Sequence, residues 1–325
     1  MYRHSQYLSS RHCAFAVVLC APTVERMLEY HHVDVFTGRP YAGNSLAVFL
    51  DQQSLAAAQM LAVTQELRHF ESIFLTRAAD GVVDARIFDL IEELPFAGHP
   101  TIGAAAVLHQ VADASWGDPL GWRLRLAART VTVTTCRVDE RTVSAELAQG
   151  APEELPESPR PDARELAAAV GLESADLRRD LPCEVVSTGL RYLIVPVVAG
   201  ALARARYTRA DMDAFLARHG AQFCYLLDVD GLEGRHWNND GLIEDVATGS
   251  AAGCVAAYLL RHGRAASGQP LLLHQGRYLG RPSRMRIAAH GSAEHVQDVT
   301  VSGEVSFVGT GRLDVVPAAD TGSRS

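Results

Sequence analysis

Two glycine-bearing turns, one in each half of the chain, could each bind an anion. One spans 97–101 (AGHPT) and the other spans 247–250 (ATGS), and an alanine-rich stretch follows each of them. Such turns predict helix starts, where unpaired N–H groups and the helix dipole attract carboxylates. Either turn alone is also explained as a tight entry into a helix. Their repetition, with His99 and Asp245 at matching entrances, favours one cleft for a small acid between two similar halves.

A carboxyl group in an apolar setting is a candidate for proton transfer. Glu71 lies where a predicted helix over 55–67 meets a predicted strand over 72–76, with Phe70 on one side and Ile73 nearby on the other. Burial raises the pKa of a carboxyl group, which lets it donate and accept protons near neutral pH. Each of these residues also has an ordinary structural explanation. A glutamate after a helix is usually solvated, His99 could be a loop histidine with its hydrogen bonds satisfied, and Asp245 could be a helix N-cap.

The elements that must position these residues form two runs along the chain. Apolar periodicity predicts strands and helices on both sides of a proline-rich segment over 150–162, which is the best linker candidate. We expect an N-terminal lobe over 28–152, completed by about 305–318, and a C-terminal lobe over 153–304. Residues 1–27 are expected to be a disordered extension. The two alanine-rich helices are not amphipathic, so each is expected at the centre of a lobe, wrapped by sheet.

Composition limits the classes of function. The 325 residues are 48% apolar and 21% charged, which is typical of a globular chain, and the net charge of -8 disfavours nucleic-acid binding. The six cysteines are spread without metal-binding or disulfide spacing. No segment is a candidate membrane span, and we expect a cytoplasmic protein.

Three common kinds of active site are disfavoured by the motifs. No Gly-x-Gly-x-x-Gly follows a predicted strand, which argues against a dinucleotide enzyme. Ser250 lacks the glycine two positions earlier that a nucleophile elbow requires. No two histidines are four residues apart, as a helical metal-binding pair would be.

The longer motifs resemble those of the PhzF-like family of phenazine-biosynthesis isomerases. The resemblance covers about residues 30 to 315 and rests on ordered runs at 43–44 (GN), 71–72 (ES), 93–101 (ELPFAGHPT), 244–253 (EDVATGSAAG), 274–276 (HQG) and 280–283 (GRPS). It implies the α+β diaminopimelate-epimerase-like fold, with two pseudo-symmetric lobes that are each a curled sheet or barrel around a central helix. It also implies a homodimer and proton transfer without a metal or an organic cofactor.

Carried over by motif, the resemblance implies a site made of seven residues. Glu71 would be the general acid and base, with His99 and Asp245 beside it as catalytic partners. The residues expected to bind the substrate are Asn44, Gly98, Gly249 and Ser250. Related epimerases and racemases use two opposed thiols, but neither helix entrance carries a cysteine here, and Cys254 lies about a turn inside the second helix, where packing is expected.

The resemblance therefore implies a cofactor-independent isomerase of secondary metabolism. It would shift a proton on a small unsaturated amino or hydroxy acid, as trans-2,3-dihydro-3-hydroxyanthranilate isomerase does. Departures from the family pattern at 68–70 (RHF), 89–90 (DL) and 236–240 (HWNND) leave the substrate open. Isomerisation of vinyl-dihydropyrrole carboxylic acids is one alternative, and a non-catalytic protein that binds small acids or serves as a scaffold is another.

Overall fold

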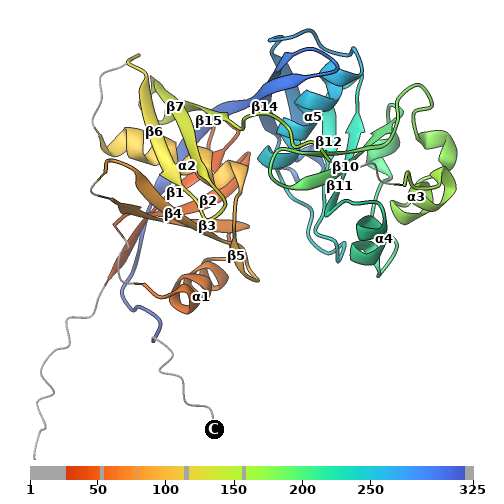
Figure 1. Ribbon diagram of the computed structural model, residues 1–325. Helices are drawn as coiled ribbons and strands as arrows, with labels where there is room; N and C mark the ends of the chain where they lie inside the picture. Colours follow the sequence, from red (N-terminus) through yellow and green to blue (C-terminus); the bar gives the residue numbers. More distant parts are fainter. Residues whose placement is uncertain (1–26, 52–54, 79, 113–116, 156–158, 319–325) are drawn as a thin grey trace, which may run out of the picture.

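A computed structural model describes residues 27–51, 55–78, 80–112, 117–155 and 159–318 (Figure 1). The predicted extension over 1–27 therefore lies, apart from Met27, outside the described residues, as do three residues of the predicted linker, 156–158. No helix among the described residues is both long and apolar enough to cross a membrane.

The N-terminal half is a closed barrel around one helix, α2 (Gly98–Val111). The barrel closes because its first strand pairs with the second strand on one side and with the last strand of the chain on the other. Its strands, in order around the barrel, are β1 (Leu28–Val35), β2 (Asn44–Phe49), β3 (Glu71–Arg77), β4 (Val83–Phe88), β6 (Leu120–Arg125), β7 (Thr130–Asp139), β8 (Thr142–Ala148) and β15 (Val296–Leu313). Outside the barrel, α1 (Ala57–Leu67) packs on β3 and β4. The short strand β5 (Glu93–Leu94) pairs with β4 in the antiparallel direction.

The C-terminal half continues the same sheet from β15 and curls around a second helix, α5 (Gly249–Arg261). Beyond β15 its strands are β14 (Ser283–Gly291), β13 (Leu271–Gln275), β12 (Glu233–Arg235), β11 (Phe223–Asp228), β10 (Arg191–Val197) and β9 (Glu184–Ser187). The two lobes are seen side by side in Figure 1, with β14 and β15 running between them. The expected α+β architecture, two lobes with one central helix each, is confirmed.

The central helices are made of small residues because the sheets wrap them on all sides. In α5 every residue from Gly249 to Leu260 is buried, and in α2 every residue from Gly98 to His109 is buried. The fit is tight: a Cβ atom on Gly103 would lie 2.4 Å from a methyl carbon of Leu46. A larger side chain there would push the helix away from β2.

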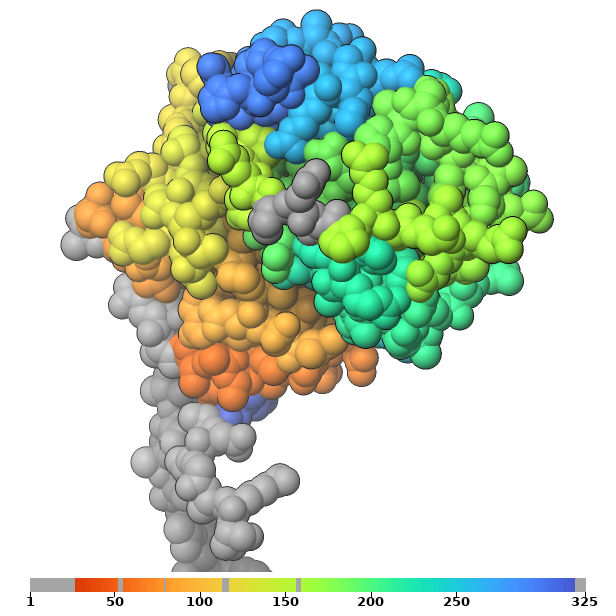
Figure 2. All heavy atoms as spheres, turned by 45° about the vertical axis from the view of Figure 1, so that its right-hand side comes forward, coloured from red at the N-terminus to blue at the C-terminus, as the bar shows by residue number. Residues whose placement is uncertain are grey.

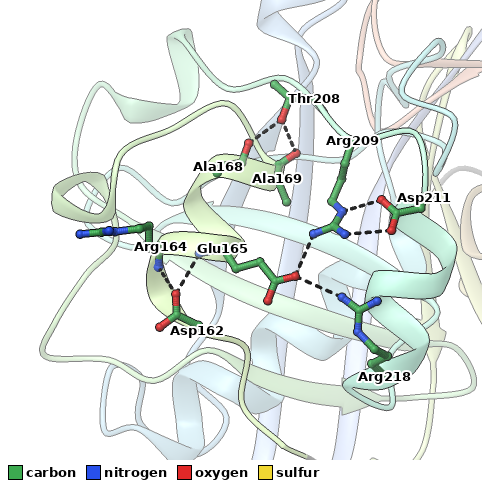
Figure 3. Close-up of polar contacts among 9 residues, drawn as sticks. All are labelled: Asp162, Arg164, Glu165, Ala168, Ala169, Thr208, Arg209, Asp211 and Arg218. Carbon is green, nitrogen blue, oxygen red and sulfur yellow. Dashed lines mark hydrogen bonds and ion pairs between the residues drawn. The ribbon is translucent and has the colours of Figure 1, made fainter.

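Two short outer helices of the C-terminal lobe are tied together by ion pairs (Figure 3). Glu165 on α3 (Ala163–Ala169) accepts hydrogen bonds from Arg209 at 3.0 Å and from Arg218 of α4 (Met212–Arg218) at 3.1 Å. Arg209 in turn forms a bidentate pair with Asp211. Each exposed pair contributes little alone, but the network holds α4 in place, and α4 carries Asp213, which lines the cavity described next.

Candidate active site

A cavity of about 880 Å³ lies between the two lobes. The N-terminal lobe lines it with Phe70, Glu71 and residues from 89–99, and the C-terminal lobe contributes residues from 190–192, 213–223 and 236–250. Figure 2 shows the lobes in contact, with orange-to-amber N-terminal segments beside the teal segment that carries α4. The site therefore exists only where both lobes meet.

Glu71 projects into this cavity from the first position of β3. Arg68 ends α1 in the left-handed conformation, with φ of 59°, which turns the chain from the helix into the strand. The Glu71 side chain is buried, with the residue only 7% exposed. Burial raises its pKa well above the ordinary value, and the negative charges of Asp245 and Asp89 raise it further. The carboxyl group therefore holds its proton at a higher pH than a solvated glutamate would.

His99 meets Glu71 from the first turn of α2. Its Nδ1 lies 3.5 Å from Glu71 Oε2 and 3.4 Å from the Nδ2 amide of Asn44. Burial lowers the pKa of His99 to about 4, although the charge of Asp245 opposes this shift. Because burial disfavours the charged form of both groups, we interpret the contact as a protonated carboxyl group beside a neutral imidazole, not as an ion pair. Glu71 Oε2 and His99 Nε2 have no hydrogen-bond partner in the part of the chain that the structure describes.

Asp245 reaches the same cavity from the loop before α5 and is held by three donors. Its Oδ1 accepts from Asn44 Nδ2 at 2.8 Å and from the Ala247 N–H at 3.2 Å, and its Oδ2 accepts from Thr248 Oγ1 at 2.7 Å. Asn44 also donates to the Ala247 carbonyl at 3.2 Å. Because Asn44 begins β2 of the N-terminal lobe, these bonds connect the two lobes directly behind the site.

The two helix starts meet at the floor of the cavity. A Cβ atom on Gly98 would lie 3.0 Å from the carbonyl carbon of Gly249 and 3.1 Å from the backbone nitrogen of Ser250. Neither helix has a side-chain N-cap, so the first N–H groups of both are left for a ligand. Ser250 Oγ lies 2.8 Å from the Tyr192 hydroxyl. The N–H groups at the two helix starts can therefore bind a carboxylate.

Most of the predicted site residues come together at this cavity. Six of them line it: Glu71, Gly98, His99, Asp245, Gly249 and Ser250. Asn44 is not among the lining residues and lies behind them, only 1% exposed. We therefore expect Asn44 to position Asp245 and His99 instead of contacting the substrate.

Several lining residues had no recognisable signal in the sequence. Tyr192 lies within an ordinary apolar strand, β10, and Phe223 begins β11. The three segments that depart from the family pattern did carry a signal, because each of them contributes lining residues: Phe70, Asp89, His236, Asn238, Asn239 and Asp240. None of the four cysteines within the described residues lines it, and Cys254 is fully buried.

The cavity is predominantly acidic. Among the described lining residues Arg191 is the one lysine or arginine, whereas Asp89, Glu92, Asp213 and Asp240 join Glu71 and Asp245. A ligand that carries a carboxylate for the helix starts and an amino or hydroxyl donor for the acidic walls would match this charge distribution.

The chain is similar to known proteins along most of its length. The chain matches the family described as "Phenazine biosynthesis-like protein" over residues 33–311. It is 35% identical over 302 residues to a trans-2,3-dihydro-3-hydroxyanthranilate isomerase of Pseudomonas aeruginosa, which covers 88% of this chain and 99% of that protein.

Solved structures show the same fold. A predicted epimerase from Pseudomonas aeruginosa is 48% identical, with a TM-score of 0.80, over 88% of this chain and 99% of that one. A hydroxyproline epimerase from Agrobacterium vitis, 13% identical, superposes with a TM-score of 0.57 over 89% and 92% of the two chains. The diaminopimelate-epimerase-like fold expected from the motifs is confirmed.

Proposed function

This chain belongs to the phenazine biosynthesis-like protein family and is an isomerase, and we propose that it relocates a proton on a small unsaturated amino or hydroxy acid without a cofactor. The observation that carries the proposal is a buried carboxyl group, Glu71, beside two uncapped helix starts in one cavity. The acidic walls further support a substrate that bears an amino or hydroxyl group as well as a carboxylate.

In the proposed mechanism the substrate carboxylate binds at the N–H groups that open α2 and α5. The protonated carboxyl group of Glu71, whose proton exchanges with solvent between turnovers, donates that proton to one carbon of the conjugated system, and the resulting carboxylate then takes a proton from another carbon. One C–H bond forms, another breaks, the double bonds shift, and Glu71 ends protonated again. No proton is gained or lost overall. The raised pKa of Glu71 is suited to this exchange because an acid and base works best when its pKa lies near the operating pH.

Asp245 and His99 assist Glu71 from either side in this proposal. The carboxylate of Asp245, fixed by Asn44 and Thr248, accepts a hydrogen bond from the substrate amino or hydroxyl group. The neutral imidazole of His99 lies against Glu71 and fixes where its proton resides. Both residues keep the reacting carbon within reach of one carboxyl group.

Deuterium incorporation tests the proposal. We expect the wild-type enzyme, in deuterated water, to place deuterium on carbon in trans-2,3-dihydro-3-hydroxyanthranilate or in a vinyl-dihydropyrrole carboxylic acid, as read by NMR. Glu71→Gln should lower the rate by about 10²–10⁴-fold, the usual contribution of a positioned acid or base. Glu66→Gln, the same change on the exposed face of α1, is the matched control.

Two results would contradict the proposal. Near wild-type exchange in the Glu71→Gln variant would exclude Glu71 as the proton carrier. Tight binding of these acids with no exchange at all would instead indicate a non-catalytic binding protein, which was the alternative left open by the sequence.

A further inference from the structure

One buried polar side chain in the cavity has no role in the mechanism above. His236 follows β12, lines the cavity and is only 5% exposed. Its ring packs edge-on against Tyr192 and Phe223, with centroid distances of 5.6 Å to each. The imidazole is therefore fixed in orientation by aromatic neighbours on two sides.

Hydrogen bonding fixes which nitrogen of this ring carries the proton. Nδ1 lies 2.9 Å from the carbonyl oxygen of Cys224, and because a carbonyl can only accept, Nδ1 is the donor. Burial lowers the pKa of His236, so the ring is neutral near pH 7. Nε2 is consequently left with a free lone pair.

The Nε2 atom of His236 is not fully enclosed by protein. Nε2 has no partner among the described residues, yet it is not one of the fully enclosed polar atoms that lack a partner. Since the residue lines the cavity, its exposed nitrogen opens there. The backbone N–H of Asp245 donates to the carbonyl of His236 at 2.9 Å, which places the two residues side by side.

The surrounding groups leave Nε2 without a donor of its own. The carboxylate of Asp245 is the acceptor in each of its hydrogen bonds, from Asn44, Ala247 and Thr248, and has no proton to donate to Nε2. The Tyr192 hydroxyl is engaged with Ser250. An acceptor that is desolvated and unpaired costs binding energy unless the ligand supplies a donor.

We propose that Nε2 of His236 accepts a hydrogen bond from an amino or hydroxyl group of the substrate and so selects acids that carry such a donor. His236 is then a specificity-determining residue that contacts the ligand from the C-terminal lobe, whereas Glu71 belongs to the N-terminal lobe. This inference rests on the proposed function for its class of ligand, a small cyclic acid. A site built to pair with a substrate donor rejects analogues that lack it.

Binding of unreactive acids tests this inference separately from turnover. The probes are benzoate, 2-aminobenzoate and 3-hydroxybenzoate, which share a flat six-membered ring and differ only in donors. Wild-type protein should bind at least one donor-bearing acid about tenfold more tightly than benzoate, measured by calorimetry. His236→Asn keeps an N–H near the Cys224 carbonyl but removes Nε2, so most of this preference should be lost.

A matched substitution away from the cavity serves as the control, and NMR of wild-type protein provides a second measurement. His295→Asn, the same change at an exposed loop position, should leave the preference unchanged. In wild-type protein the ¹⁵N resonance of His236 Nε2 should move when the preferred donor-bearing acid is added and stay in place with benzoate, even if the variant does not fold.

The inference is overturned if wild-type protein binds neither donor-bearing acid better than benzoate, or if His236→Asn retains the full preference. Its failure is distinguishable from failure of the proposed function. Selective binding without deuterium exchange would contradict the isomerase mechanism and support the role of His236. Deuterium exchange without selective binding would support the mechanism and contradict the role of His236.

Discussion

At the scale of single residues, Glu71 must be buried enough to keep its proton and still face the cavity. Burial beside Asp245 and Asp89 raises its pKa, which means that the folded state binds this proton more tightly than the unfolded chain does. The stability that this proton confers is fully present below the ordinary pKa of about 4.5 and is lost as the pH rises towards the folded-state pKa.

The pH dependence of stability should therefore separate wild-type protein from Glu71→Gln. The glutamine stays neutral, so the variant should be more stable than wild type by about 1–2 kcal/mol at pH 8, a gain typical of neutralising an active-site group. The difference should shrink as the pH falls to 4.5. Urea unfolding at several pH values measures this, and a difference that does not change with pH would contradict it.

Asn44 acts through its neighbours and should affect both activity and stability. Replacing it with alanine removes the 2.8 Å hydrogen bond to Asp245 and the bond to the Ala247 carbonyl, both of them buried. Loss of a bond to a charged group costs about 1.5–3 kcal/mol. We expect Asn44→Ala to lower stability by that amount and to lower the deuterium-exchange rate by about tenfold or more. An unchanged exchange rate would exclude the positioning role.

At the scale of elements, the site depends on two helix starts that touch. A Cβ atom on Gly98 would press against the backbone of Gly249, and backbone atoms cannot rotate away as a flexible side chain would. The glycines at these positions therefore keep both rows of N–H groups close enough to hold one carboxylate.

Gly98→Ala should separate the two helices. The expected loss of stability is about 1–3 kcal/mol, as for other overpacked sites, together with weaker binding of benzoate. Gly309→Ala, on β15 with open space around its Cβ position, should change neither quantity. Thermal unfolding measures the stability, and calorimetry measures the affinity for benzoate. If the two variants had the same stability and the same affinity, the interpretation that Gly98 contacts the backbone of Gly249 would be contradicted.

At the scale of the whole molecule, the lobes share one strand and one core. Val301 of β15 is fully buried and pairs with Leu147 of β8 on one side and with Ile287 of β14 on the other. These residues belong to a single hydrophobic cluster that includes both central helices. The lobes are therefore expected to unfold together.

Val301→Ala should weaken both lobes together. We expect a loss of about 1–3 kcal/mol from the cavity left behind and faster amide hydrogen exchange in α2 as well as in α5. Val315→Ala, at a position 70% exposed, is the control. Faster exchange confined to one of the two helices would show that the lobes are independent.

The sequence by itself determined the architecture and most of the site. Small-residue helices predicted two sheet-wrapped centres, and the motifs located six residues that line the cavity. Such features are local or belong to contiguous motifs, so they are readable along the chain. A single strand, β15, runs over 296–313 and so crosses the expected boundary between the C-terminal lobe over 153–304 and the segment of about 305–318 that was expected to complete the N-terminal lobe.

Only the tertiary structure decided which other residues line the cavity. Asn44 proved to lie behind the cavity, while Tyr192 and His236 line it. Whether a polar side chain is left unpaired depends on partners brought from distant strands, as the Cys224 carbonyl is for His236. No local pattern encodes that, because desolvation and hydrogen-bond pairing are properties of the space between the lobes.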